Sequence, residues 1–121
     1  MEDKELKELN QYYGSLQYHK GWLNVNLTDG VAYICKNGYT WLMTDSISVI
    51  KTLPKILKYL EKQNFLVVKL NTNLQEHKAV MTIEDGNNNI LYDQKYNYTD
   101  SKVENLVMYY QNNVMMLSGE Y

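Results

Sequence analysis

The spacing of apolar residues divides this chain into a first half with a helical period and a second half with a strand period. In the first half, apolar side chains recur three and four residues apart, as on one face of an amphipathic helix. After Asn64 they alternate with polar side chains, as in a half-buried strand. The pattern predicts one α+β domain over residues 1–121, with a helical half at about 3–63 and a strand half at about 64–121.

The helical half predicts two helices before its centre. The first covers residues 3–16 and begins at the N-cap Asp3. Residues 17–27 read as irregular, with Trp22 and Leu23 as anchors of the loop. A second helix follows the N-cap Thr28 and stops at Asn37-Gly38, since glycine tolerates the left-handed conformation that ends helices.

Two further helices are predicted on either side of Pro54. Residues 41–53 are apolar on more than one side, which is typical of a central buried helix. Proline breaks that helix and suits the first position of the next, because it has no N–H to donate. The last helix is expected to hold Ile56, Leu57 and Leu60 inward.

The strand half predicts a sheet with short turns. Asp85-Gly86 and Gln111-Asn112-Asn113 have the composition of tight hairpin turns. Consecutive strands joined in this way predict an antiparallel meander, with the N-terminal helices packed on one of its faces. The predicted strands are residues 65–70, 79–84, 90–96, 106–110 and 114–117.

Composition narrows the cellular setting and the available chemistry. Cys35 is the only cysteine, so no internal disulfide can form and a reducing, cytoplasmic location is expected. The polar start Met1–Glu5 is unlike a signal peptide, and no apolar run approaches the ~20 residues of a membrane span. His19 and His77 match no metal-binding or catalytic spacing, so neither a metal nor a cofactor is expected.

A strip of lysines is the strongest cationic feature. Lys51, Lys55, Lys58 and Lys62 are spaced four, three and four residues apart, which places them on one helix face. Such a strip suits phosphate or an acidic protein surface, or it is the solvated side of an amphipathic helix. The net charge of −2 and the absence of arginine disfavour nucleic acid as the partner.

Tyrosines form a second candidate binding surface. Alternation along one strand puts several of them on one face, where they can contact a protein or ligand or pack against the helices. The residues concerned are Tyr92, Tyr96, Tyr98, Tyr109 and Tyr110.

A candidate pocket centres on Asp45, which lies within the most apolar predicted helix. A buried carboxylate must be paired, hydrogen-bonded or protonated. One hypothesis makes it an acid with a raised pKa in a pocket with Trp41 and Asp29. The other makes it a structural acceptor, bonded by a neighbouring tyrosine or by Trp41.

Several short stretches resemble DUF6876, a family of bacterial and phage proteins of unknown function. The resemblance implies one compact domain, often encoded near mobile elements, and brings no activity with it. The stretches are Tyr12-Tyr13, Thr28-Asp29-Gly30-Val31, Tyr39-Thr40-Trp41-Leu42-Met43-Thr44-Asp45, Tyr98-Thr99-Asp100 and Met116-Leu117-Ser118-Gly119-Glu120-Tyr121.

Three functions remain open at this point. The first is a non-enzymatic binding protein of a phage or mobile element, which inhibits a bacterial defence system (anti-CRISPR-like or another kind) by binding a host protein or trapping a small molecule. The second is a nucleic-acid-binding accessory protein that uses the lysine strip. The third is a hydrolase, which requires Asp45 to meet His19 or Asp29. An exposed edge strand would allow a homodimer.

Overall fold

The computed structural model describes residues 18–120, so the helix predicted for residues 3–16 lies outside the described residues. The described chain opens with β1 (His19–Lys20), the 3₁₀ turn η1 (Trp22–Asn24) and β2 (Asn26–Leu27). Trp22 is 50% exposed, yet its indole N–H donates to Ser48 Oγ at 2.9 Å. Trp22 therefore ties this segment to the long helix, whereas Leu23 is exposed.

The predicted second helix forms as α2 (Asp29–Ile34). Thr28 caps it by accepting a hydrogen bond from the backbone N–H of Val31. The chain then passes through the π-helical turn η2 (Cys35–Tyr39), where Gly38 adopts φ +101°. A positive φ is easy only for glycine, so Gly38 marks the predicted stop.

The central helix is α3 (Thr40–Thr52), whose buried residues include Leu42, Ile47 and Ile50. Its successor α4 (Pro54–Leu60) begins at the proline, as predicted. Ile56 is buried, but Leu57 is 42% exposed, so the inward position predicted for Leu57 is wrong. Within residues 18–120, no helix has the length and apolar character needed to cross a membrane.

In the described part of the chain, seven strands form one sheet in the order β1-β2-β7-β6-β3-β4-β5. The order departs from the predicted meander, and the parallel pair β2–β7 makes the sheet mixed. The strands β1 and β2 also bring residues of the helical half into the sheet. The longer strands are β3 (Leu66–Asn73), β4 (Lys78–Glu84), β5 (Ile90–Tyr96), β6 (Asn105–Gln111) and β7 (Val114–Leu117).

The strand order has a physical reason in the burial of β3. Leu66, Val67 and Val68 are all buried, so this strand needs neighbours on both edges and cover on its faces. It pairs with β4 on one side and β6 on the other. The connection from β5 to β6 therefore returns past the ends of β4 and β3, and β5 is left at the edge.

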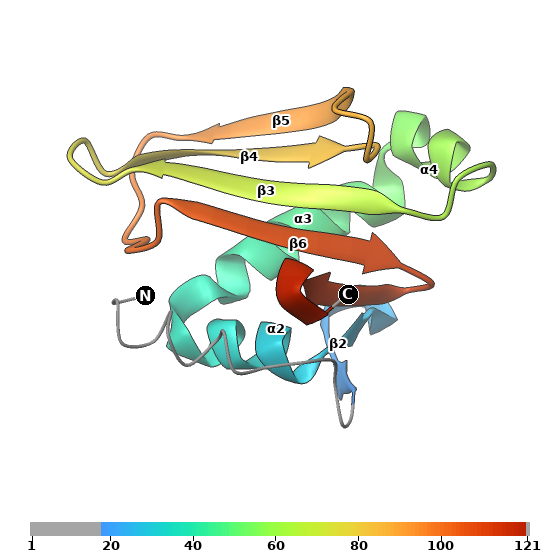
Figure 1. Ribbon diagram of the computed structural model, residues 1–121, viewed down its shortest axis with the longest axis horizontal. Coiled ribbons are helices and arrows are strands. Elements are labelled where there is room, and N and C mark those ends of the chain that lie inside the picture. The colour runs from blue at the N-terminus through green and yellow to red at the C-terminus, as the bar shows by residue number, and fades with distance from the viewer. Residues whose placement is uncertain (1–17, 121) are drawn as a thin grey trace.

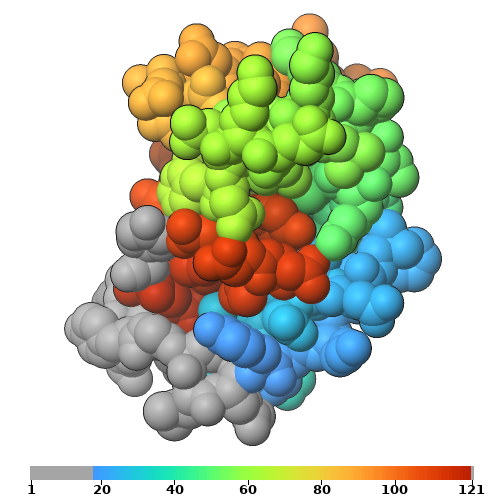
Figure 2. All heavy atoms as spheres, turned by 90° about the vertical axis from the view of Figure 1, so that its right-hand side faces the viewer, coloured from blue at the N-terminus to red at the C-terminus, as the bar shows by residue number. Residues whose placement is uncertain are grey.

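One core joins the helices to the sheet. Ile47 and Ile50 of α3 share it with Val68 of β3, Met81 of β4 and Met108 of β6. In Figure 1, α3 crosses behind β3 and β6. Figure 2 shows the red atoms of the last strands between the yellow-green atoms of β3 and the blue atoms that follow residue 18, in agreement with the strand order.

Candidate functional site

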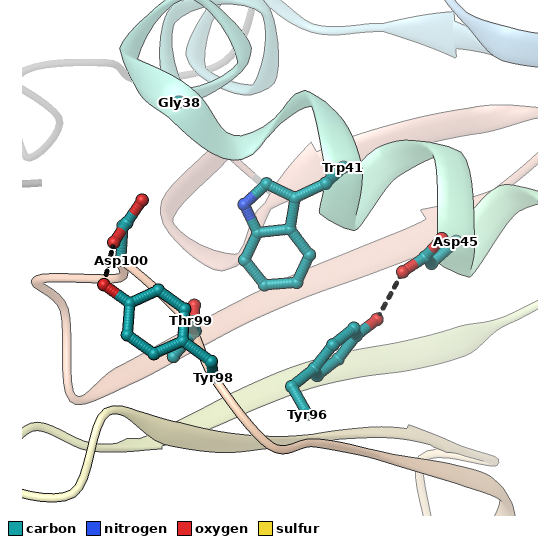
Figure 3. A pocket seen from close by; sticks show the side chains of 7 residues that line it. All are labelled: Gly38, Trp41, Asp45, Tyr96, Tyr98, Thr99 and Asp100. Atoms are coloured by element: carbon teal, nitrogen blue, oxygen red, sulfur yellow. Dashed lines mark hydrogen bonds between the residues drawn. The ribbon is translucent and has the colours of Figure 1, made fainter.

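An open cleft of about 340 Å³ lies between the first half of α3 and the segment that follows β5. Three aromatic rings and two carboxylates surround it (Figure 3). Its lining residues are Gly38, Trp41, Asp45, Tyr96, Tyr98, Thr99 and Asp100.

One wall of the cleft is a contact between α3 and β5. The rings of Trp41 and Tyr96 meet edge to face, with 4.9 Å between their centroids. The hydroxyl of Tyr96 donates to Oδ2 of Asp45 at 2.7 Å. Burial, and then the carboxylate of Asp45, raise the pKa of Tyr96 well above its usual value, so this phenol keeps its proton and remains a donor. The tyrosine partner that the sequence suggested for Asp45 is thus present.

The opposite wall is Tyr98, which is 69% exposed. Its hydroxyl donates to Oδ1 of Asp100 at 2.9 Å, and this bond raises the pKa of Tyr98. The ring of His77 lies against it, with 5.9 Å between centroids. Tyr98 therefore lines the cleft with His77 as a ring neighbour, although its side chain is largely exposed.

Buried hydrogen bonds hold the second wall in place. The hydroxyl oxygen of Tyr39, the residue just before α3, lies 2.8 Å from Ser101 Oγ. The backbone N–H of Thr99 donates to the carbonyl of His77 at 2.8 Å, and the N–H of Ser101 donates to Thr99 Oγ1 at 3.2 Å. Thr99 and Ser101 are both buried. The segment that carries Tyr98 and Asp100 is therefore fixed against both the helix and the β3–β4 turn.

The polar groups that face the cleft favour a cation. Asp45 and Asp100 each have one oxygen bonded to a tyrosine and a second oxygen for which no hydrogen bond forms within residues 18–120. In the part of the chain that the structure describes, no lysine lines the cleft. The indole N–H of Trp41 also makes no hydrogen bond to the described residues, and Figure 3 shows it on the side of the ring toward Asp100.

Asp29 does not belong to the cleft, contrary to the expected pocket. Its Oδ1 lies 2.9 Å from Nε2 of His19, at the start of α2. Asp45 meets Tyr96 instead of either residue. The convergence on which the hydrolase hypothesis depends does not occur.

The tyrosines do not form one patch. Tyr96 and Tyr98 enter the cleft, while Tyr92 packs beside the core and donates to Gln94 at 3.0 Å. Neighbours on a strand point to opposite faces. Accordingly, Tyr110 is 5% exposed in the core, and Tyr109 lies on the other face, 5.1 Å from the ring of Phe65.

The four lysines do not share one helix face either. Leu53 is extended between α3 and α4, which separates Lys51 from the other three. Lys51 instead donates to Asn113 Oδ1 at 2.8 Å. Lys55 and Lys58 are exposed on α4, and Lys62 lies beyond its end. The prediction of one lysine face treated residues 51–62 as a single helix. Pro54 divides that segment into two helices, so the spacing of the lysines does not place them on one face.

No cluster of three or more His, Cys, Asp or Glu side chains suited to a metal ion occurs among residues 18–120. Cys35 is half-buried, and burial raises the pKa of its thiol.

Asp100 is the cleft residue that sequence reasoning missed as a site. The available signal was its place in the stretch Tyr98-Thr99-Asp100, which resembles the family.

Four of the five stretches that carry the family resemblance meet in space at two places, and Tyr12-Tyr13 lies outside the described residues. Residues of 39–45 and 98–100 form the cleft together. Residues of 28–31 and 116–120 meet where the carboxylate of Glu120 accepts hydrogen bonds from Thr28 Oγ1 and the N–H of Gly30. Segments far apart in the chain are thus joined by side chains within the resembling stretches.

Comparison with curated proteins finds no match, and comparison with solved structures finds none. The model of a family of unknown function, DUF6876, matches residues 3–121, which is nearly the whole chain. The resemblance drawn from short stretches is therefore confirmed, and the chain belongs to the DUF6876 family.

Proposed function

We propose that this protein is a non-enzymatic binding protein whose cleft takes a cationic group, a guanidinium or an ammonium, of its ligand. One observation carries the proposal. The rings of Trp41, Tyr96 and Tyr98 and the carboxylates of Asp45 and Asp100 line the same open cleft, and no basic side chain of residues 18–120 lines it.

The chemistry of these groups is complementary to a cation with several N–H donors. A cation over an aromatic face gains about 0.5–2 kcal/mol, the larger value when water is excluded. Each carboxylate adds a charge-assisted hydrogen bond through the oxygen that its tyrosine leaves available. The tyrosine hydroxyls orient Asp45 and Asp100 before a ligand arrives, which lowers the entropic cost of binding.

A binding role is also supported by how the titratable groups are paired. Asp45 accepts from Tyr96, and Asp100 accepts from Tyr98. In each pair a carboxylate accepts from a phenol whose pKa is raised, so at neutral pH both phenols stay protonated and hold the carboxylates in place.

The cation can come from a lysine or arginine side chain of a partner protein or from a free organic cation. A cleft of about 340 Å³ is at the small end for ligand sites, which run from about 300 Å³. Its size suits one inserted side chain. The proposal favours a protein partner, and inhibition of a bacterial defence protein in the host is its most specific form.

Calorimetric titration with N-acetylarginine amide tests the cleft. Its matched control ligand is N-acetylcitrulline amide, which has nearly the same shape and no charge. We expect binding of the arginine compound only, weakened about tenfold or more by Asp45→Asn. Asp93→Asn, a change at an exposed carboxylate outside the cleft, should leave binding unchanged. Equal binding of the two compounds would contradict the proposal.

The same titration separates the two sources. If the cation belongs to a protein, an arginine within a longer peptide binds more tightly than the capped amino acid, because flanking residues add contacts. If the cation is a free small molecule, flanking residues add nothing. Guanosine is a neutral compound with N–H donors comparable to those of arginine, and it is titrated in parallel. Tighter binding of guanosine than of N-acetylarginine amide would contradict a cationic ligand.

The defence-inhibitor form has its own test. Wild-type protein, expressed in bacteria with an active defence system, should raise the plating efficiency of a sensitive phage. Asp45→Asn should lose this effect if the cleft carries it. An equal effect of both proteins would place the function outside the cleft.

A further inference from the structure

Among residues 18–120, the strand β5 forms an edge of the sheet. It pairs with β4 on one side and ends the strand order on the other (Figure 1). An edge strand of seven residues presents a row of backbone N–H and C=O groups that can pair with another strand. Natural edges of this length are usually protected by charged side chains, by proline, by a bulge or by a covering segment.

The charges on β5 are of opposite sign. Asp93 and Lys95 are both exposed and, two residues apart, lie on the same face of the strand. In the part of the chain that the structure describes, neither forms an ion pair. Repulsion between like charges therefore does not protect this edge.

We propose that two copies of this chain pair β5 against β5, antiparallel, about a two-fold axis at Gln94. In this register Asp93 faces Lys95 of the second copy and Lys95 faces its Asp93. Residues directly opposite in an antiparallel pair lie about 4.5–5.5 Å apart. The two-fold axis makes these two ion pairs equivalent, since each joins Asp93 of one copy to Lys95 of the other. A two-fold interface requires this kind of self-complementary surface.

The register is selected by these charges. A shift of the axis by one residue places Asp93 opposite Asp93 or Lys95 opposite Lys95 of the second copy, so both ion pairs are lost and like charges face each other. Pairing at the other end of the sheet has less to offer, since β1 has only two residues. The β5 edge is therefore the strand edge that best fits a second copy.

The interface leaves the cleft accessible. Tyr96 points from β5 toward α3, whereas Asp93 and Lys95 lie on the opposite face of the strand. This proposal does not rest on the cationic ligand, and each can fail without the other.

Sedimentation over a range of protein concentrations tests the dimer with a set of charge variants. Wild-type protein should show a concentration-dependent dimer. Lys95→Glu makes both positions acidic and Asp93→Lys makes both basic, so each should weaken the dimer about tenfold or more. The double variant Asp93→Lys with Lys95→Asp exchanges the charges and should restore it.

A mixture of the two single variants gives a further prediction. Every cross-strand pair between Lys95→Glu and Asp93→Lys chains is of opposite sign, so the mixture should form a heterodimer while each chain alone stays monomeric. Circular dichroism of each variant confirms that its fold is intact. Single variants that dimerise like the wild type, or a double variant that fails to dimerise while folded, would overturn the register.

A cysteine at the proposed axis detects even a weak dimer. Gln94→Cys on a Cys35→Ser background should form a disulfide-linked dimer under mild oxidation. Gln111→Cys on the same background is the control, because Gln111 lies on β6 in the interior of the sheet. A monomeric wild type together with no faster cross-linking at position 94 than at 111 would overturn the proposal.

Discussion

Thr28 Oγ1 donates a 2.6 Å hydrogen bond to Oε1 of Glu120, although the two residues are 92 positions apart. The same carboxylate accepts from the backbone N–H of Gly30 at 3.1 Å and of Leu117 at 3.0 Å. A negative charge at the start of α2 satisfies N–H groups that no helical partner can reach. Glu120 therefore fastens the end of the described chain to the start of this helix.

This arrangement predicts that residue 30 must be glycine. A Cβ at Gly30 would lie 2.7 Å from Glu120 Oε1 and 2.7 Å from Leu117 Cδ1. We expect Gly30→Ala to lower the free energy of unfolding by about 1–3 kcal/mol in chemical denaturation. Gly119→Ala is the matched control, because a Cβ there meets nothing within 4 Å. Equal stability of the two variants would show that the carboxylate does not hold this geometry.

The bond between Tyr39 and Ser101 is predicted to stabilise the fold and the cleft together. Tyr39→Phe leaves the buried hydroxyl of Ser101 with fewer partners and should cost about 1–2 kcal/mol of stability. Tyr98→Phe removes only an exposed hydroxyl and should change stability by about 0.5 kcal/mol or less. Denaturation curves compare them, and a Tyr39→Phe protein as stable as wild type would contradict the role given to this bond.

Tyr96 is predicted to make stability fall at high pH. Its pKa in the folded protein is raised above the ordinary value of 10.0, mainly by burial and then by Asp45. The folded state therefore keeps a proton that the unfolded chain loses, and stability declines as the pH rises past about 10, by up to ~1.4 kcal/mol per pH unit. Unfolding measured between pH 9 and 11 should show a shallower decline for Tyr96→Phe. An unchanged slope would mean that Tyr96 ionises normally.

Lys51 is predicted to act as a structural residue, unlike the other lysines of the proposed strip. It donates to the side chain of Asn113, whose amide N–H₂ in turn donates to the carbonyl of Asn24. Lys51→Met should cost about 0.5–1.5 kcal/mol of stability. Lys58→Met, at an exposed position on α4, should cost about 0.5 kcal/mol or less. The same denaturation experiment distinguishes them, and equal effects would argue against the Lys51 bond.

Local features of the fold were predictable because they depend on neighbours in sequence. The N-cap Thr28, the stop at Gly38 and the helix start at Pro54 follow from single residues with strong backbone preferences. The bounds of β5 and β7 coincide with the predicted residues 90–96 and 114–117. The turn at Asn112–Asn113 has both residues at positive φ, as its composition indicated.

Strand order was not predictable, because it depends on which strand takes the centre of the sheet. Alternation in residues 106–110 predicts a strand, but not that this strand pairs with β3. The strands β1 and β2 have two residues each, which is too short for any periodic signal. Their pairing with β7 comes from tertiary contacts alone.

The cleft was predictable only in part. Trp41 and Asp45 stand out because a carboxylate and an indole lie one turn apart in an apolar helix. Asp29 has the same chemistry but lies at the start of α2, with His19 as its partner. Asp100 gave no periodic signal, because it lies in the segment after β5 that crosses the ends of β4 and β3.

The central claim is that a cation enters the cleft beside Trp41, and the two indole N–H signals in an NMR titration test it most directly. Trp22 donates its N–H to Ser48 and lies outside the cleft, so it is an internal reference. On addition of N-acetylarginine amide, we predict a saturable shift of the Trp41 signal, no shift of the Trp22 signal, and no response to N-acetylcitrulline amide. A Trp41 signal that stays in place, or that moves equally with the neutral compound, would contradict the account.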